Sequence, residues 1–277
     1  MRIARAAVIL LAFTLAPEYA VIRAAPAAQA PAEPSLTKEQ MQKFLSTAKV
    51  TGGRQTSKGI TSPFKLKLTD GTLTHDAAFQ SIEERRMRKD FGDGTSELNF
   101  VDSYLYDLAA YNIAELVGLD TMMPVTVPRS WNGMRGALSW WVPTLMDEKE
   151  RLAKKIQPPP SAGWNDQMHR MRVFTALVYD TDRNLTNVLI DPDWKLWMID
   201  FTRAFRLHPT LVNEKDLIKC DRNLLEKLKA LNKDDVARVT KDLLTKSEAA
   251  PIMIRRDKIV EHFNKLVAEK GEAEVLY

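Results

Sequence analysis

The chain has 277 residues, of which 45% are hydrophobic and 27% are charged, so it can bury a sizeable core without disulfides. Its formal net charge of +4 is too small for a polyanion-binding surface, which argues against nucleic acid as the main partner. The single cysteine, Cys220, excludes an internal disulfide, and its neighbours Lys219, Asp221 and Arg222 suggest no zinc site.

The first 30 residues have the three parts of a secretory signal peptide. Arg2 and Arg5 precede the apolar run 6–16, and an Ala- and Pro-rich stretch follows. The run is too short to span a bilayer comfortably, so we predict cleavage near residue 30 and no stable membrane insertion; an uncleaved anchor is the alternative. The mature chain is then extracytoplasmic, either periplasmic or secreted. Losing three arginines and one glutamate lowers its formal charge from +4 to +2.

Residues 31–50 are predicted to form a linker and a short helix whose N-cap is Thr37. The following segment, 51–59, is polar and rich in glycine, so we expect a loop, although its glycines lack the order of a phosphate-binding loop. Residues 64–68 alternate apolar side chains with lysines, which predicts a strand. An Asp-Gly turn then leads into a second strand at about 72–82.

A charged, glycine-punctuated segment at 83–99 is predicted to be a mobile connection. It is followed by an amphipathic helix at about 100–117, closed by Gly118. Two further strands, 122–127 and 136–142, are expected to form a hairpin whose turn contains Asn-Gly.

The rest of the chain is mainly helical in pattern. Helices are expected at 146–156, 161–179, 221–231, 233–245 and 251–270. We place His169 at the surface or at a helix cap, and Pro251 in the first turn of the last helix.

The stretch 179–205 carries acidic residues at both ends of a predicted hairpin. Two apolar runs flank an Asp-Pro-Asp turn, so closing the hairpin brings Asn187 near Asp200, with Asp182 in the loop just before. These side chains offer hard oxygen ligands, which suit magnesium and a phosphorylated substrate. The alternative is that the Asp and Asn residues only stabilise two ordinary turns.

The spacing adds a resemblance. Asp182 and Asn187 match the D-x-x-x-x-N pattern of a kinase catalytic loop, and Asp200-Phe201-Thr202 falls where kinases have D-F-G. The stretch resembles the catalytic core of the protein-kinase-like superfamily, especially its atypical branches: the phosphoinositide lipid kinases, the HipA kinases and the secreted casein-kinase-like enzymes.

This resemblance implies an α+β, two-lobed kinase-like fold, with a small β-rich N-terminal lobe at 51–143 and a mainly helical C-terminal lobe at 144–277 that holds the catalytic loop. It also implies that Asp182 orients or deprotonates the acceptor hydroxyl. Asn187 and Asp200 would hold Mg²⁺ or Mn²⁺ against the phosphates of ATP.

The sequence departs from the kinase pattern at the phosphate-binding lysine. Gln80 stands where an A-x-K-like signature would place that lysine. Lys67 or Lys65 from the neighbouring strand could substitute, or Lys58 from the preceding loop. For the two strand lysines, the alternative is a solvated sheet face.

A kinase-like fold also needs an acid on the helix at 100–117 to pair with that lysine. Asp107 is the central candidate for this part of the nucleotide site, and Asp102 and Glu97 are alternatives. Trp140 and Trp141 would lie near the adenine; because adjacent strand residues face opposite ways, at least one belongs to the core.

The function predicted from these residues is a secreted or periplasmic phosphotransferase that moves a phosphoryl group from a metal-nucleotide to an unidentified hydroxyl acceptor. The first alternative is a catalytically inactive kinase-fold binding module, a pseudokinase. A second is a periplasmic scaffold whose acidic cluster binds calcium alone.

Overall fold

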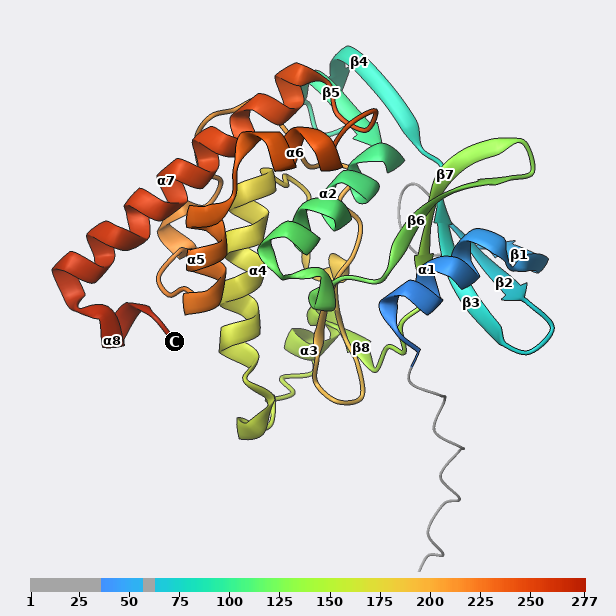
Figure 1. Cartoon of the computed structure of the whole chain (residues 1–277), viewed down its shortest axis with the longest axis horizontal. Coiled ribbons are helices and arrows are strands. Elements are labelled where there is room, and N and C mark those ends of the chain that lie inside the picture. The colour runs from blue at the N-terminus through green and yellow to red at the C-terminus, as the bar shows by residue number, and fades with distance from the viewer. Residues whose placement is uncertain (1–35, 57–62) are drawn as a thin grey trace, which may run out of the picture. The chain divides into compact units, whose positions relative to one another are not determined.

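The computed structural model describes residues 36–56 and 63–277. A five-stranded antiparallel sheet lies on one side of this part of the chain, and most of the helices lie on the other (Figure 1). The predicted signal peptide is outside the described residues. Within them, no helix combines the length and the apolar character needed to cross a membrane.

The sheet has the strand order β1-β2-β3-β7-β6. Its strands are β1 (Lys49–Gln55), β2 (Phe64–Thr69), β3 (Thr74–Gln80), β6 (Thr126–Trp131) and β7 (Met134–Trp140). Helix α1 (Lys38–Thr47), which has the predicted N-cap, lies against β6 and β7, and its Phe44 and Leu45 join the buried apolar cluster of this sheet. The alternation predicted for β2 is confirmed, because Leu66 and Leu68 are buried there while the two lysines point to the opposite face.

The loop prediction for the glycine-rich segment 51–59 is wrong over most of that segment, because residues 49–55 form β1 and pair with β2. Gly53 fits this edge because a Cβ at that position would lie 2.7 Å from the side chain of Leu66. The sequence therefore shows glycine where two strands and a side chain approach closely, not where a loop bends. Lys58 lies outside the described residues.

The prediction of a mobile connection at 83–99 is also wrong. It forms the hairpin of β4 (Glu83–Asp90) and β5 (Ser96–Ser103), which stands next to the five-stranded sheet in Figure 1. Ion pairs form along β4, such as Lys89 with Glu84 at 2.9 Å, and the Lys89 ammonium also lies 4.1 Å from the ring centroid of Phe100 in β5. The hairpin has no continuous apolar face, which is why hydrophobic periodicity failed to reveal it.

Helix α2 (Tyr104–Val117) begins four residues later than predicted, because Ser103 is still in β5 and caps the helix. It ends at Gly118, whose φ of 72° suits the left-handed C-cap, as expected. The hairpin predicted around Asn-Gly is confirmed as β6 and β7, with φ values of 48° at Asn132 and 76° at Gly133.

The helical part packs around α4 (Trp164–Val178), whose buried side chains join one large apolar core. The other elements there are β8 (Met146–Asp147), α3 (Glu148–Ala153), β9 (Val188–Ile190), β10 (Leu196–Met198), α5 (Arg222–Ala230), α6 (Lys233–Val239), α7 (Lys246–Lys270) and α8 (Glu272–Val275). Short 3₁₀ turns lie at Asp120–Met122, Pro160–Ala162, Leu185–Asn187 and Glu214–Asp216.

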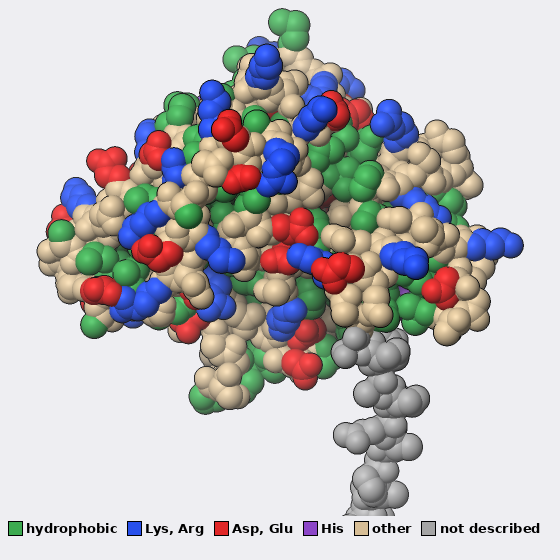
Figure 2. Space-filling view, in the orientation of Figure 1, with side chains coloured by type: hydrophobic (Ala, Val, Ile, Leu, Met, Phe, Trp, Pro, Cys, Tyr) green, Lys and Arg blue, Asp and Glu red, His purple; other side chains and the backbone are tan. Residues whose placement is uncertain are grey.

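Two local predictions in this part are wrong. His169 is buried near Tyr277 and is not a surface residue. Helix α7 begins after the capping box of Thr245 and Glu248, so Pro251 lies inside the helix and not in its first turn. On the face seen in Figure 2, basic and acidic side chains are intermingled over the helices.

Candidate active site

The predicted hairpin at the centre of the chain is present as β9 and β10. Leu196 pairs with Ile190 and Met198 with Val188, and all four side chains are buried. Asp191 serves the turn, because its Oδ1 accepts the backbone N–H groups of residues 193 and 195 at 2.9 Å each. The turn interpretation therefore holds for Asp191, while the acidic residues at the open end have other partners.

The loop before β9 closes on itself across the five-residue interval from Asp182 to Asn187. The amide Nδ2 of Asn187 donates to the backbone oxygen of Asp182 at 3.0 Å. This commitment of the nitrogen leaves Oδ1 as the ligand-type atom of the amide. The backbone oxygen of Asn187 accepts from Ile199 N at 3.1 Å, which brings Asn187 next to the residue before Asp200.

Arg183 joins the two halves of the site, and the sequence interpretation gave it no role. Its guanidinium donates to the backbone oxygens of Asn187 at 2.9 Å and Ile199 at 2.6 Å. It also donates to the backbone oxygen of Asp200 at 3.2 Å. The side chain is only 7% exposed and is neutralised by Asp180, 2.6 Å away and fully buried. The three-residue spacing of this Asp and Arg was the available sequence signal.

Asp200 has a constrained geometry. Its φ of 58° is in the left-handed region, and its Oδ1 accepts the hydroxyl of Thr202 at 2.9 Å. Burial raises the pKa of this carboxyl, and the negative charges of Asp102 and Asp182 raise it further, against the effect of Arg183. Such a carboxylate has surplus negative charge that a bound cation would offset.

Asp107 lies in the same region but does not make the predicted pair with a strand lysine. Its Oδ1 accepts the backbone N–H of Phe201 at 2.6 Å. Burial raises the pKa of Asp107 well above its usual value, and the nearby charge of Asp200 adds to the effect. The two alternative acids differ: Glu97 pairs with Arg203 and Arg206, and Asp102 is buried.

Lys65 and Lys67 have different surroundings. The Lys65 ammonium is 2.9 Å from a carboxylate oxygen of Asp76 and 4.0 Å from the ring centroid of Trp141. Lys67, two residues along the same face, is exposed. As expected for adjacent strand residues, the two tryptophans face opposite ways. Trp141 lies beside Lys65, whereas Trp140 packs on the α1 side of the sheet, with its ring centroid 5.7 Å from that of Phe44.

Gln80, which stands where the kinase pattern has a lysine, bonds to the neighbouring backbone. Its Oε1 accepts the backbone N–H groups of Ser81 and Ile82 at 3.1 and 3.3 Å, which stabilises the turn between β3 and β4. The residue that departs from the kinase pattern at this position therefore stabilises a local turn.

The oxygen donors fit a metal-nucleotide better than a free metal ion. In the part of the chain that the structure describes, no three His, Cys, Asp or Glu side chains gather as a metal cluster. Magnesium is usually held by one or two protein oxygens together with substrate phosphates and water, and Asn187 and Asp200 match that pattern. A calcium site would need about six to eight oxygens.

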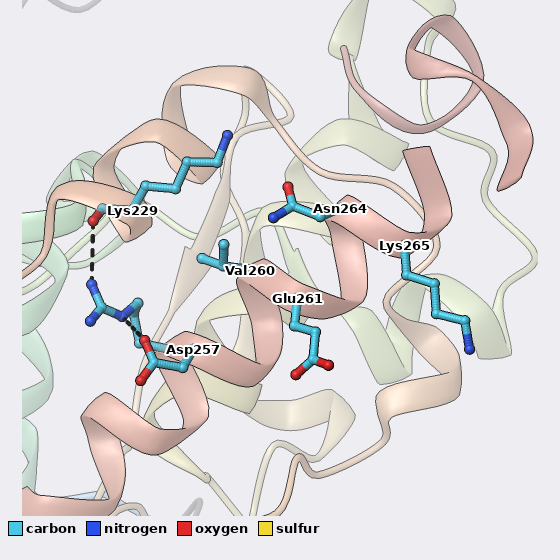
Figure 3. A pocket seen from close by; sticks show the side chains of 7 residues that line it. Lys229, Asp257, Val260, Glu261, Asn264 and Lys265 are labelled. Carbon is cyan, nitrogen blue, oxygen red and sulfur yellow. Dashed lines mark hydrogen bonds and ion pairs between the residues drawn. The ribbon is translucent and has the colours of Figure 1, made fainter. Parts of the chain in front are cut away.

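A surface hollow of about 670 Å³ lies elsewhere, beside α5 and α7 (Figure 3). It is lined by Lys229, Arg256, Asp257, Val260, Glu261, Asn264 and Lys265. Arg256 is bound to Asp257 at 2.7 Å and donates to the backbone oxygens of Leu228 at 3.2 Å and Lys229 at 3.3 Å, at the C-terminal end of α5. None of the predicted site residues lines this hollow, and its open, highly charged walls resemble ordinary helix surface.

Comparisons with known proteins support the fold. No family model matches the sequence, and no curated protein sequence matches it. Among solved structures, hydra Fam20 with sugar matches with a TM-score of 0.63 and 16% identity, over 86% of this chain and 91% of that chain. The Golgi casein kinase with Mn/ADP bound matches with a TM-score of 0.61 and 12% identity, over 86% and 78% of the two chains. The Helicobacter pylori proinflammatory kinase CtkA matches with a TM-score of 0.51 and 9% identity, over 82% and 98%.

These similarities cover most of each chain. Because the sequence identities are low, the similarities support the fold alone. They agree with the small β-rich part and the mainly helical part described above. The resemblance and the fold class predicted from the sequence are confirmed. This chain has the two-lobed fold of the atypical kinase-like proteins.

Proposed function

We propose that this protein is a kinase-like phosphotransferase that moves a phosphoryl group from a metal-nucleotide to a hydroxyl acceptor. The observation that carries the proposal is the set of bonds from Arg183 and Asn187, which hold Asp182, Asn187 and Asp200 in one cluster. Phosphoryl transfer depends mainly on positioning and charge neutralisation, and residues fixed before the substrate binds supply both.

Each residue then has a defined task. Asp182 is partly exposed, and its Oδ1 accepts Nδ2 of Asn184 at 3.1 Å, so the carboxylate is oriented while remaining able to orient or deprotonate an acceptor hydroxyl. Asn187 and Asp200 would hold Mg²⁺ or Mn²⁺. When bound, the metal neutralises charge on the nucleotide phosphates. Arg183 is a positioning residue, because its guanidinium binds the backbone oxygens of Asn187 and Asp200.

The nucleotide site is proposed to use Lys65, Lys67 or Lys58, with Asp107 fixing the segment after Asp200. Lys65 lies beside Trp141, at the start of the connection between the lobes, where the adenine of the nucleotide would bind. The solved Golgi casein kinase contains Mn/ADP, which supports a search with manganese as well as magnesium. Nucleic acid is not an expected partner, and the acceptor is a hydroxyl compound.

An extracytoplasmic location, periplasmic or secreted, is part of the proposal. It rests on the charged, apolar and small-residue parts of the first 30 residues. A Golgi casein kinase among the structural neighbours is consistent with a secretory role for this fold.

A second candidate is a binding module that has the fold without catalysis. It is favoured by one observation: Asp107 binds the backbone of Phe201, and Lys65 binds Asp76, so these two side chains do not form the lysine–acid pair of an active kinase. Such a module would bind nucleotide without turnover, or bind none.

The test is the unfolding temperature of the mature protein with ATP and either Mg²⁺ or Mn²⁺, compared with Asp200→Asn. A ligand at 100 times its Kd stabilises the native state by about 2.7 kcal/mol, so a clear rise is expected in the wild type and not in the variant. Asp193→Asn, in the exposed β9–β10 turn, is the matched control and should keep the rise.

Turnover separates the two candidates. Phosphate release from ATP should fall strongly in Asp182→Asn while its nucleotide-dependent stabilisation remains. Stabilisation without turnover in the wild type would support the binding module. If neither metal with ATP raises the unfolding temperature, the proposed phosphotransferase is wrong.

A further inference from the structure

Strand β5 runs beside the segment that follows Asp200. The backbone N–H of Ser103 donates to the oxygen of Thr202 at 3.0 Å. Farther along, Nη1 of Arg206 donates to the backbone oxygen of Val101 at 3.0 Å. The β4–β5 hairpin therefore contacts residues 202–206 through its backbone as well as through its side chains.

One side chain of β5, Glu97, links this segment to the hairpin by charge. Its two carboxylate oxygens take one arginine each: Oε2 pairs with Arg203 Nη2 at 2.5 Å and Oε1 with Arg206 Nη2 at 2.8 Å. Arg206 is 8% exposed and Arg203 is 19% exposed, so water screens these pairs only partly. Both guanidiniums also lie near the ring of Phe100: that of Arg203 is 4.5 Å from the ring centroid and that of Arg206 is 5.9 Å from it.

Without Glu97, two arginines three residues apart would face each other around one aromatic ring. Burial lowers the pKa of Arg206, and the charge of Arg203 lowers it further, whereas Glu97 opposes both effects. The repulsion would be relieved by moving Arg203 into water, which would pull the backbone next to Thr202. That residue donates to Asp200 and accepts from Ser103, so the displacement would reach Asp200.

We propose that Glu97 is a positioning residue that fixes Asp200 for metal-nucleotide binding by holding Arg203 and Arg206 against β5; this role rests on the proposed function. In many kinases the corresponding order comes from a phosphorylated residue that pairs with arginines. Here a carboxylate from the hairpin supplies the negative charge. The segment after Asp200 is therefore ordered without phosphorylation.

The proposal is tested by hydrogen exchange of the backbone amides at 200–206 and by the Kd for Mn²⁺-ATP, both in Glu97→Gln. Exchange at 200–206 should become roughly tenfold faster, and the Kd should rise by a similar factor, since one charge-assisted contact to each arginine is lost. Glu97→Asp, which keeps the charge, should recover part of both effects. Asp90→Asn, at the far end of β4 and paired with Arg88, is the matched control and should change neither.

The outcomes separate this role from the proposed function. If the wild type binds Mn²⁺-ATP but Glu97→Gln has the same exchange rates at 200–206 and the same Kd, only the role of Glu97 is overturned. Faster exchange with an unchanged Kd shows that the contact does not act on Asp200 and also overturns the role. Absence of Mn²⁺-ATP binding in the wild type overturns the proposed function and the role with it. If Glu97→Gln does not fold, Arg203→Gln, which removes the more exposed partner, is measured in the same way with the same expected changes.

Discussion

The carboxylate of Asp107, on α2, accepts the backbone N–H of Phe201 at 2.6 Å and so joins the helix to the residue after Asp200. The two acidic side chains lie close enough for the charge of Asp200 to raise the pKa of Asp107. Helix α2 therefore holds the proposed metal-binding segment through a side-chain bond to the backbone of Phe201, at the energetic cost of placing two carboxylates near each other.

Replacing Asp107 by Asn should make stability less dependent on pH. The pKa of Asp107 is raised above 3.8, so the folded state binds this proton more tightly than the unfolded state does. Wild-type stability contributed by this group is therefore lost as pH rises from about 4 through the raised pKa. The Asn side chain can still accept from Phe201, so the free energy of unfolding of the variant, relative to wild type, should increase with pH.

Urea unfolding at pH 5 and pH 8 measures this difference. Asp193→Asn is the control for loss of one exposed carboxylate. A variant that becomes less stable relative to wild type as pH rises would show that Asp107 is stabilising as a carboxylate.

Replacing Arg183 by Met should destabilise the protein by about 3 to 5 kcal/mol, because Asp180 is left as a buried charge without its partner. The double variant Arg183→Met with Asp180→Asn should recover part of the loss. Arg238→Met removes an exposed ion pair with Asp235 and should cost about 0 to 1 kcal/mol. Chemical unfolding of the four proteins measures these values, and equal effects of the two arginine variants would contradict the bridging role of Arg183.

Replacing Lys65 by Met should weaken binding of Mg²⁺-ATP roughly tenfold if its ammonium contacts the nucleotide, because one charge-assisted contact is lost. Lys67→Met tests the other strand candidate, since that lysine lies on the same face of β2 but is exposed. Calorimetric titration of both variants compares them. A loss seen only in Lys67→Met would move the contact to that residue, and no loss in either would favour Lys58.

Replacing Glu248 by Ala should destabilise the connection between the β4–β5 hairpin and α7. Its carboxylate accepts from Tyr106 and from Arg85 at 2.7 Å, and it completes the capping box of α7. The variant loses the bond from the Thr245 N–H and leaves the buried Tyr106 hydroxyl without its acceptor, which together cost about 1 to 3 kcal/mol, whereas Arg85 keeps its ion pair with Glu83 at 2.9 Å. The free energy of unfolding measures the sum, and Glu226→Ala, on the surface of α5, is a control expected to lie within about 0.5 kcal/mol of wild type.

Stability attributed to Glu248 should also decrease in acid. Its hydrogen bonds and the charge of Arg85 lower the pKa of Glu248 below 4.5, despite the opposing effect of burial. The contribution is present above pH 4.5 and is lost as pH falls through the lowered pKa. A pH-independent difference between Glu248→Ala and wild type would contradict this assignment.

The sequence by itself determined the candidate site in outline, because its residues are neighbours along the chain. A five-residue interval brings the Asn187 amide to the Asp182 backbone, and a short hairpin brings Asn187 to Ile199, so local geometry was sufficient. The alternating pattern of β2 and the Asn-Gly turn at Asn132 also depend on local rules, and both were confirmed.

Only the tertiary structure decided the partners of Asp107 and Glu97. Phe201 is 94 residues from Asp107, and Arg203 is 106 residues from Glu97, so no spacing rule relates them. The β4–β5 hairpin that presents Glu97 has a charged sequence without apolar periodicity, so its backbone pairing could not be predicted from the hydrophobic pattern. Hydrophobic patterns predict which faces become buried, whereas the pairing of polar groups is fixed only when distant segments meet.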